Sequence, residues 1–387
     1  MKFIRRHITH LAIVMMLFIT VLTGCQRKDL YLAQHGLLSI DVSVYQIDLN
    51  LLWGADWKTE WQYLWDESLY GPIGYSDPDG VRANVYALTE DNDRTRYTTR
   101  NLAKGGGRVS LTTCQSYDMV FYNNDTEYIL FSADDANDYL YATTRSNTKA
   151  AYTRSYTHYN QPDQLFGTYI HDLYVTDDPD YYTLEYDDEG YPYYLYKVEA
   201  TLTPYTFIYL CQVMLLNNND DGGKRVTGCE GISVDGMSGG VDLFTRVTDS
   251  TNLVTITQDD TKPMLTDRDL RLPDGTQTTG DIFAARVMTW GLPGIDPLAQ
   301  ILTRAQAEPQ DSIGAGIGLI MRNGTVYPIQ RNITQQIKQR PAGGVITLVI
   351  DVAEIPDSIV GDKPKPGGGF DASVDNWQNE INADIII

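Results

Sequence analysis

The sequence predicts a mainly β protein built from two β-sandwich domains. Short segments recur in which every second residue is hydrophobic, and clusters of Gly, Asn and Asp that favour turns separate them at close intervals. About 360 residues follow the N-terminal leader described below, which is more than one hydrophobic core usually fills. We therefore expect two domains, residues 36–200 and 201–387, divided where the sequence becomes strongly apolar near residue 200.

Residues 1–24 are typical of a lipoprotein signal peptide. Three basic residues precede the hydrophobic run Leu11–Leu22, which is too short for a good membrane span. The run ends in a lipobox, Leu-Thr-Gly-Cys, so we expect cleavage between Gly24 and Cys25 and lipid on the Cys25 thiol. Residues 25–35 would then tether an exported protein to a bacterial membrane. The alternative is an ordinary signal peptide that happens to carry a cysteine.

Alternation marks the first predicted strand. Leu38, Ile40, Val42 and Val44 alternate with polar residues, which is typical of a strand with one face in water. Segments 81–87 and 117–121 repeat the pattern, and segments 128–131 and 205–216 are apolar on both faces. These segments predict further strands of the two sandwiches.

Tryptophan spacing predicts a helix between the first and second strands. Trp53, Trp57, Trp61 and Trp65 recur every four residues, which places them on one broad helical face. We expect this face to pack on the first sandwich; a ligand-binding aromatic cage is the alternative. A second, short helix is predicted after Asp296, where an N-cap residue precedes a proline.

Composition argues against several functions. Without the three basic residues of the leader, 27 Lys and Arg stand against 51 Asp and Glu, a net charge of −24 that argues against nucleic-acid binding. The cysteines after Cys25 are Cys114, Cys211 and Cys229, an odd number without metal-ligand spacing. Cys211 and Cys229 could form a disulfide, or Cys211 could be a buried thiol. We expect no metal and no cofactor.

Two further patterns concern chemistry and binding. Residues 236–240 match the G-x-S-x-G nucleophile motif at Ser238, but no histidine follows, so we expect a turn and no enzymatic activity. Residues 139–209 hold sixteen of the 27 tyrosines, interleaved with acidic runs. Such a surface could bind a glycan or calcium, or could be an exposed strand edge with loops.

The C-terminal residues carry a last signal. A glycine-rich spacer precedes residues 370–387, in which Ile381, Ala383, Ile385 and Ile387 alternate with polar residues behind Trp377. An aliphatic strand of this kind must be buried in its own sheet or in that of a neighbour.

Together these segments resemble the fimbrillin-like lipoproteins of Bacteroidales, which are subunits of protease-triggered pili. The resemblance covers nearly the whole chain. It implies two tandem transthyretin-like β-sandwiches, an outer-membrane location at the cell surface, and other pilus subunits as partners. It rests on the lipobox, the tryptophan segment and residues 36–42, 81–86, 234–239 and 370–377.

The resemblance also implies a mechanism of assembly. In polymerising subunits a trypsin-like protease cuts after an arginine near the first strand and removes that strand with its lipid. A strand from the next subunit then fills the vacated groove. In this chain the removed strand would be residues 37–44, and the donor strand would be residues 377–387.

This sequence departs from the polymerising pattern. No arginine lies between Arg27 and Arg82, and Lys58 is the only lysine between Lys28 and Arg82. Cutting at Arg82 would remove the tryptophan segment as well. We therefore favour a lipid-retaining anchor or accessory subunit; the alternatives are a stalk or tip subunit and a surface lipoprotein that binds a glycan or a host ligand.

Overall fold

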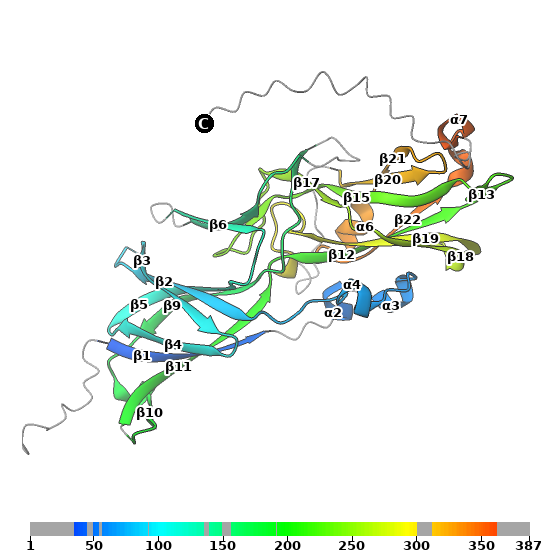
Figure 1. Ribbon diagram of the computed structural model, residues 1–387. Helices are drawn as coiled ribbons and strands as arrows, with labels where there is room; N and C mark the ends of the chain where they lie inside the picture. Colours follow the sequence, from blue (N-terminus) through cyan, green and yellow to red (C-terminus); the bar gives the residue numbers. More distant parts are fainter. Residues whose placement is uncertain are drawn as a thin grey trace, which may run out of the picture. The chain divides into compact units, whose positions relative to one another are not determined.

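The chain is mainly β, as the sequence predicts. The computed structural model describes residues 35–44, 49–53, 56–91, 93–134, 139–148, 156–190, 192–299 and 312–361 (Figure 1). Two compact units can be distinguished, and the chain passes between them several times instead of crossing one boundary near residue 200. Unit 1 comprises Met1–Ser43, Val81–Met119 and Ile170–Thr201; unit 2 comprises Val44–Gly80, Val120–Tyr169 and Leu202–Ile387.

Unit 1 is built around an eight-stranded sheet that closes on itself. Its order is β1-β4-β3-β2-β5-β9-β11-β10, and an additional pairing between β1 and β11 closes the sheet. A closed sheet has fewer free edges than the sandwich that the sequence predicts. The strands are β1 (His35–Val44), β2 (Gly80–Leu88), β3 (Arg94–Ala103), β4 (Gly106–Thr112), β5 (Gln115–Asn123), β9 (Phe166–Val175), β10 (Thr183–Tyr186) and β11 (Pro192–Pro204).

The period-two patterns explain which residues fill the interior of unit 1. Leu38 and Ile40 of β1 are fully buried, as are Val81, Ala83 and Val85 of β2. The strands predicted at residues 38–44, 81–87 and 117–121 are thereby confirmed. The more specific transthyretin-like topology stays a prediction.

Unit 2 has two main sheets. One has the order β18-β19-β12-β22 and the other the order β21-β20-β15-β17-β8. Figure 1 shows the two sheets as separate layers. The strands are β8 (Thr157–Tyr159), β12 (Phe207–Leu216), β15 (Val226–Ser238), β17 (Leu253–Gln258), β18 (Lys262–Arg271), β19 (Gln277–Thr289), β20 (Gly314–Met321), β21 (Val326–Asn332) and β22 (Gly344–Asp351).

Smaller elements complete unit 2. A three-stranded sheet has the order β16-β7-β6, and β13 pairs with β14. Their bounds are β6 (Ile129–Asp134), β7 (Tyr139–Thr144), β13 (Asn219–Asp220), β14 (Gly223–Lys224) and β16 (Gly240–Asp242); the helices α6 (Thr334–Gln339) and α7 (Asp357–Val360) lie near the C-terminal end. The Asp296 carboxylate accepts hydrogen bonds from the N–H groups of Leu298 and Ala299, which confirms the predicted N-cap. Among the described residues, no helix has the length and apolar character that a membrane span requires.

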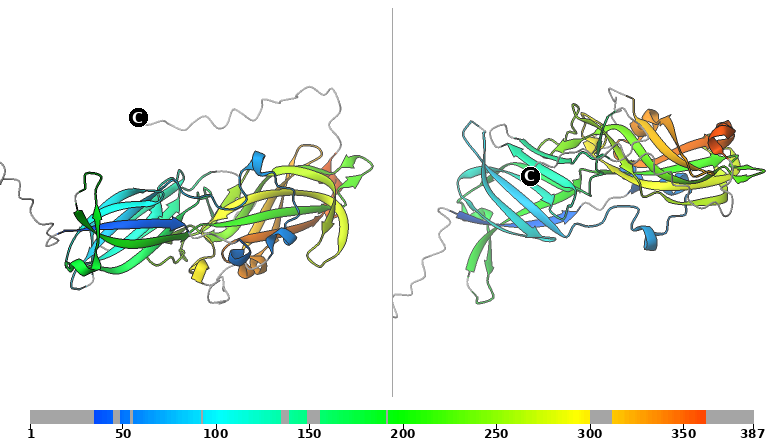
Figure 2. Two further views of the ribbon diagram at one scale, coloured as in Figure 1. Left: turned by 90° about the horizontal axis from the view of Figure 1, so that it is seen from below. Right: turned by 45° about the horizontal axis from the view of Figure 1, so that its top comes forward.

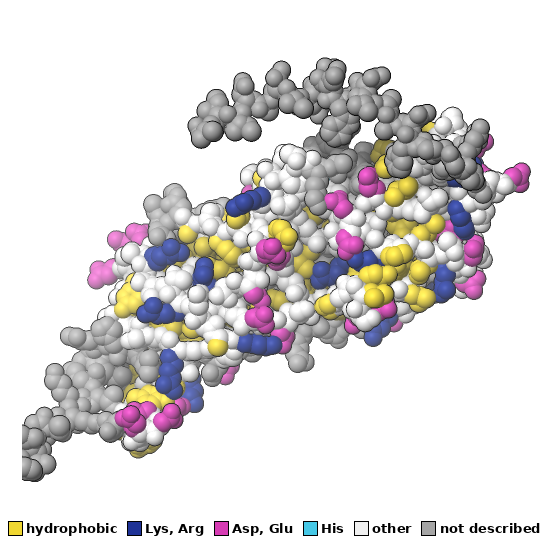
Figure 3. Space-filling model, viewed as in Figure 1, with side chains coloured by type: hydrophobic (Ala, Val, Ile, Leu, Met, Phe, Trp, Pro, Cys, Tyr) yellow, Lys and Arg dark blue, Asp and Glu magenta, His cyan; other side chains and the backbone are white. Residues whose placement is uncertain are grey.

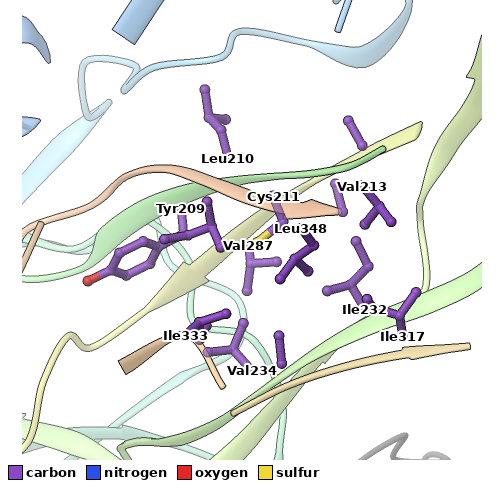
Figure 4. Close-up of a cluster of buried hydrophobic side chains, with 14 of the residues drawn as sticks. Tyr209, Leu210, Cys211, Val213, Ile232, Val234, Val287, Ile317, Ile333 and Leu348 are labelled. Atoms are coloured by element: carbon purple, nitrogen blue, oxygen red, sulfur yellow. The ribbon is translucent and has the colours of Figure 1, made fainter. Parts of the chain in front are cut away.

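The core of unit 2 explains why residues 205–216 are apolar on both faces. Tyr209, Cys211 and Val213 lie with residues of the other sheet, among them Val234 and Ile317 (Figure 4). Leu210 points to the opposite face of β12, toward the segment drawn in blue. That blue segment is the tryptophan-bearing part of the chain, so both faces of β12 are covered.

The predicted tryptophan helix is wrong in extent and in location. The segment forms three short helices, α2 (Leu49–Trp53), α3 (Trp57–Glu60) and α4 (Glu67–Tyr70), and Trp61 has an extended backbone. Trp53 and Trp61 are buried in the same cluster as Leu210, within unit 2 and not on the first sandwich. Packing of the aromatic face is thus confirmed, but its partner is the later part of the chain.

Two glutamines explain why the helix breaks. The Gln212 side chain of β12 accepts a hydrogen bond from the N–H of Gln62 (2.9 Å) and donates one to the carbonyl of Glu60 (2.8 Å). The Gln62 side chain in turn donates to the carbonyl of Arg271 (2.6 Å) and accepts from its N–H (2.7 Å). A continuous helix would keep the backbone groups of Glu60 and Gln62 for itself, whereas the extended chain offers them to the sheet.

Candidate assembly site

The first strand is an interior member of the unit 1 sheet. β1 pairs antiparallel with β4, from His35 opposite Thr112 to Asp41 opposite Gly106, and it also pairs with β11. Figure 2 shows β1, in dark blue, running between neighbouring strands. Its removal would expose backbone N–H and C=O groups on two strands together with the apolar space that Leu38 and Ile40 fill.

Lys58, the basic residue nearest to the end of β1 on its C-terminal side, lies in α3. Its ammonium group lies 5.8 Å from the centre of the Trp57 ring. The N–H of Trp61 donates to the carbonyl of Trp57 (2.8 Å) and closes this helical turn. Because a protease binds its substrate as an extended backbone, this turn must unwind before Lys58 can be cut.

The next basic residue, Arg82, lies inside β2. That strand has β3 on one side and β5 on the other. The Arg82 guanidinium donates to the Asn101 side chain of β3 (3.1 Å). Cleavage after Arg82 therefore requires β2 to separate from at least one of its neighbours.

In the part of the chain that the structure describes, β22 is an edge strand of its sheet in unit 2 and pairs with β12 alone. On its open side, the Gln336 side chain of α6 accepts a hydrogen bond from the N–H of Thr347 (2.9 Å) and donates one to the carbonyl of Thr347 (3.0 Å). A side-chain amide thus occupies the N–H and C=O groups of Thr347, which are two of the backbone groups that a strand added along β22 would use.

A cavity of about 500 Å³ lies beside this edge. Thr347 and Gln336 line it together with Glu60, Gln62 and Arg340. Arg340 and Glu60 form an ion pair across it, with 2.8 Å between nitrogen and oxygen. The edge of β22 and the cavity are adjacent, since Thr347 and Gln336 belong to both.

Several predicted site residues lie outside the described residues. These are Gly24 and Cys25 of the lipobox and the donor-strand residues Trp377, Ile381, Ala383, Ile385 and Ile387. Of the first-strand residues, Leu38 and Ile40 are buried, and Val42 and Val44 belong to β1 by their backbone.

Ser238 is enclosed, and among the described residues it has no acid–base partner at hydrogen-bond distance. It lies at the end of β15 and is fully buried, and its single O–H faces the carbonyl oxygens of Gly240 (2.7 Å) and Asp249 (3.0 Å). A catalytic serine instead hydrogen-bonds to a general base. Within the described ranges, no group of three His, Cys, Asp or Glu side chains is placed to hold a metal ion.

The three later cysteines are free thiols. Cys211 of β12 is buried, Cys229 of β15 is partly buried and Cys114 is exposed, so the disulfide alternative for Cys211 and Cys229 does not occur in this structure. Burial raises the pKa of Cys211 to about 12. Burial likewise raises the pKa of Cys229 to about 12, against the opposing effect of a hydrogen bond with Gly231. Both groups are therefore neutral thiols at ordinary pH.

The tyrosine-rich segment is distributed over several elements. In unit 1, Tyr174, Tyr181 and Tyr186 are more than half exposed, and they lie on β9, on a 3-10 turn (Pro179–Tyr181) and on β10. The Asp178 carboxylate caps that turn by accepting the N–H of Asp180 (3.0 Å). In unit 2, Tyr205 and Tyr209 are buried in the core. Around β10, hydrophobic and acidic side chains lie next to one another on the surface (Figure 3). Part of the segment thus matches the exposed edge that was one of the predicted alternatives.

Comparison with known proteins gives one family match. Residues 70–259 match the model described as Domain of unknown function (DUF5119), slightly under half of the chain. No curated protein matches the sequence.

Solved structures of similar arrangement come from Bacteroidales. A candidate adhesin from Bacteroides ovatus shares 16% identity with a TM-score of 0.46, over 86% of this chain and 99% of that one. A candidate adhesin from Bacteroides thetaiotaomicron shares 12% with a TM-score of 0.41, over 84% and 94%. The fimbrial anchor protein Mfa2 from Porphyromonas gingivalis shares 11% with a TM-score of 0.37, over 81% and 90%. The fimbrial anchor protein is of the kind that the sequence resemblance names.

Proposed function

We propose that this chain is a non-enzymatic component of a surface pilus that keeps its first strand and its N-terminal lipid. It would act as an anchor or accessory subunit held to the outer membrane through Cys25. The observation that carries the proposal is the position of β1, which is paired on both sides in a closed sheet. The nearest basic residues after it are Lys58, which lies in the helical turn α3, and Arg82, which lies in the interior strand β2.

The tryptophan segment adds support. Residues Val44–Gly80 belong to unit 2, and Trp53 and Trp61 are part of its core. Cleavage after Arg82 followed by loss of the N-terminal fragment would therefore uncover apolar surface in unit 2 as well as the groove in unit 1. Exposing so much apolar surface is unfavourable, which argues for retention.

The N-terminal residue of the mature protein tests this proposal. We expect mass spectrometry of protein taken from its native membrane to find a lipidated Cys25 as the first residue. An Arg82→Gln variant should give the same N-terminus, since no processing at residue 82 is expected. An unlipidated N-terminus beyond Val44 would contradict the anchor role and favour a stalk subunit.

We further propose that neighbouring subunits are engaged by β-strand addition and that residues 377–387 supply the strand. The alternation of Ile381, Ala383, Ile385 and Ile387 suits a strand with one buried face. The edge of β22, at which Gln336 occupies only the Thr347 position, is a place in unit 2 where such a strand could pair.

Deletion of residues 377–387 tests the donor strand. We expect the shortened protein to stay folded and monomeric by circular dichroism and size-exclusion chromatography, but to be lost from isolated filaments. Deletion of the glycine-rich residues 367–369 is the control and should leave both properties intact. Unfolding of the shortened protein would show instead that these residues complete its own core.

A further inference from the structure

A second cavity in unit 2 is not explained by assembly. Its volume is about 390 Å³, within the size range of ligand-binding pockets. Residues of four segments line it: residues 70–78 from the end of α4 onward, Asn123 with Asp125 at and after the end of β5, residues 161–166 before and at the start of β9, and Arg286 with Met288 of β19. Most of the lining side chains are polar or charged, so a hydrophilic ligand is indicated.

Arg286 is a cation that has no carboxylate partner in the described part of the chain. Its Nε donates to the carbonyl of Ile73 (2.9 Å) and its Nη2 to the carbonyl of Gly74 (3.1 Å). Burial lowers its pKa, and the neighbouring Tyr75 acts in the opposite direction. Among the described residues no acidic group lies within ion-pair distance, and Nη1 makes no hydrogen bond. Two carbonyl groups thus fix the position of the guanidinium, and its Nη1 remains available as a donor.

Two glutamines add unused donors to the same cavity. The side-chain oxygen of Gln161 accepts the N–H of Met288 (2.9 Å), and that of Gln164 accepts the N–H of Ser76 (2.7 Å). These bonds fix the orientation of both amides and leave each NH₂ group without a partner in the described part of the chain. The donors of Gln161, Gln164 and Arg286 all belong to side chains that line the cavity.

Carboxylates supply acceptors on the same lining. One oxygen of Asp163 accepts the N–H groups of Glu127 (2.7 Å) and Tyr128 (2.5 Å), and the other makes no hydrogen bond within the described ranges. The two oxygens of Asp125 accept one bond each, from the Asn123 amide (2.6 Å) and from the N–H of Asp79 (2.9 Å), and retain lone pairs. These hydrogen bonds hold the two carboxylates in fixed positions.

We propose that this cavity binds a neutral saccharide unit of a glycan. A sugar hydroxyl both donates and accepts, so it requires the mixture of free donors and free acceptors found here. Asp163 and Asp125, with Asp77 also in the lining, disfavour an anionic ligand, whereas Arg286 disfavours a cationic one. The Tyr70 ring, which packs edge-on against Trp65 at 5.4 Å, offers an apolar surface beside the polar groups. The proposal is independent of the role in pilus anchoring.

The test is a glycan array probed with the full-length protein in detergent. The array carries neutral oligosaccharides beside sialylated and uronic-acid oligosaccharides, and isothermal titration follows with the neutral glycan of highest signal. We expect binding to neutral glycans and at least about tenfold weaker binding for the double variant Gln161→Glu, Gln164→Glu. This variant keeps both acceptor oxygens and removes both free donors, so two hydrogen bonds to the glycan are lost.

A matched substitution controls for charge and folding. Gln258→Glu, at the end of β17 and outside the cavity lining, should bind like the unmodified protein. Arg286→Lys, which preserves a cation, should also weaken binding because it loses the fixed planar donors. The proposal is overturned if the unmodified protein binds no neutral glycan, if only acidic glycans bind, or if the double variant binds as tightly as Gln258→Glu.

Discussion

Replacing Trp53 by alanine is expected to lower the free energy of unfolding by about 3–5 kcal/mol, because it removes a large buried side chain from the core of unit 2. Trp53 is 2% exposed and packs edge-on against Trp57, with 5.7 Å between ring centres. Its indole N–H has no hydrogen-bond partner among the described residues, so the loss is one of packing. Gly343, at φ +101°, leaves room for the ring, since a Cβ there would lie 2.8 Å from the indole nitrogen.

Urea unfolding followed by circular dichroism measures this effect. Leu64→Ala is the control, because Leu64 lies in the same segment but is 61% exposed. We expect the control to change the unfolding free energy by about 0.5 kcal/mol or less. Equal effects of the two substitutions would show that the tryptophan segment is not part of the core of unit 2.

The second large effect is expected at Asp281, which is 1% exposed and surrounded by donors. One of its oxygens accepts from the Lys224 ammonium (2.8 Å) and from the N–H of Asp267 (2.9 Å). The other oxygen accepts from the Asn218 amide (2.7 Å). Asn218 cannot reverse its amide without loss, since its own oxygen accepts the N–H of Val226 and its nitrogen donates to the carbonyl of Val226.

Asp281→Asn is therefore expected to lower the free energy of unfolding by about 2–4 kcal/mol, because either orientation of the new amide places its NH₂ group against another donor. The matched control is Asp267→Asn, which removes the other carboxylate of Lys224, at 3.1 Å and 67% exposed. Because an exposed ion pair contributes less than about 1 kcal/mol to the free energy of unfolding, we expect this control to lose no more than that. Equal losses of unfolding free energy for the two variants in the same urea titration would contradict this account.

Local patterns in the sequence predict the strands well. Leu38, Ile40 and the alternating residues of β2 face the interior because period two places every second side chain on one face. Asp296 and the proline after it identify a helix start by local chemistry alone. In each case the residues that decide the outcome are neighbours in the sequence.

Partners far apart in the sequence were not predictable in the same way. A four-residue spacing of tryptophans shows that an apolar face exists, but not which surface covers it. That depends on Gln212 and Leu210, about 150 positions later in the chain. The closing pair of β1 and β11 and the cavity around Arg286 likewise join distant segments, and no spacing motif marks them. The free NH₂ groups of Gln161 and Gln164 can be identified only in the structure, because there the side-chain oxygens accept the N–H groups of Met288 and Ser76.

The closed sheet of unit 1 also has a consequence for the order of events during folding. β1 is the first of its strands to be synthesised, whereas its two partners, β4 and β11, come much later, and β11 is the last strand of the sheet. Contacts between such distant segments form slowly, since a long loop must close first. One edge of β1 must therefore stay unpaired until β11 has been synthesised, even when β4 already pairs with its other edge. A folding intermediate in this state exposes a strand edge prone to aggregation, so a chaperone that covers this edge is expected to speed folding.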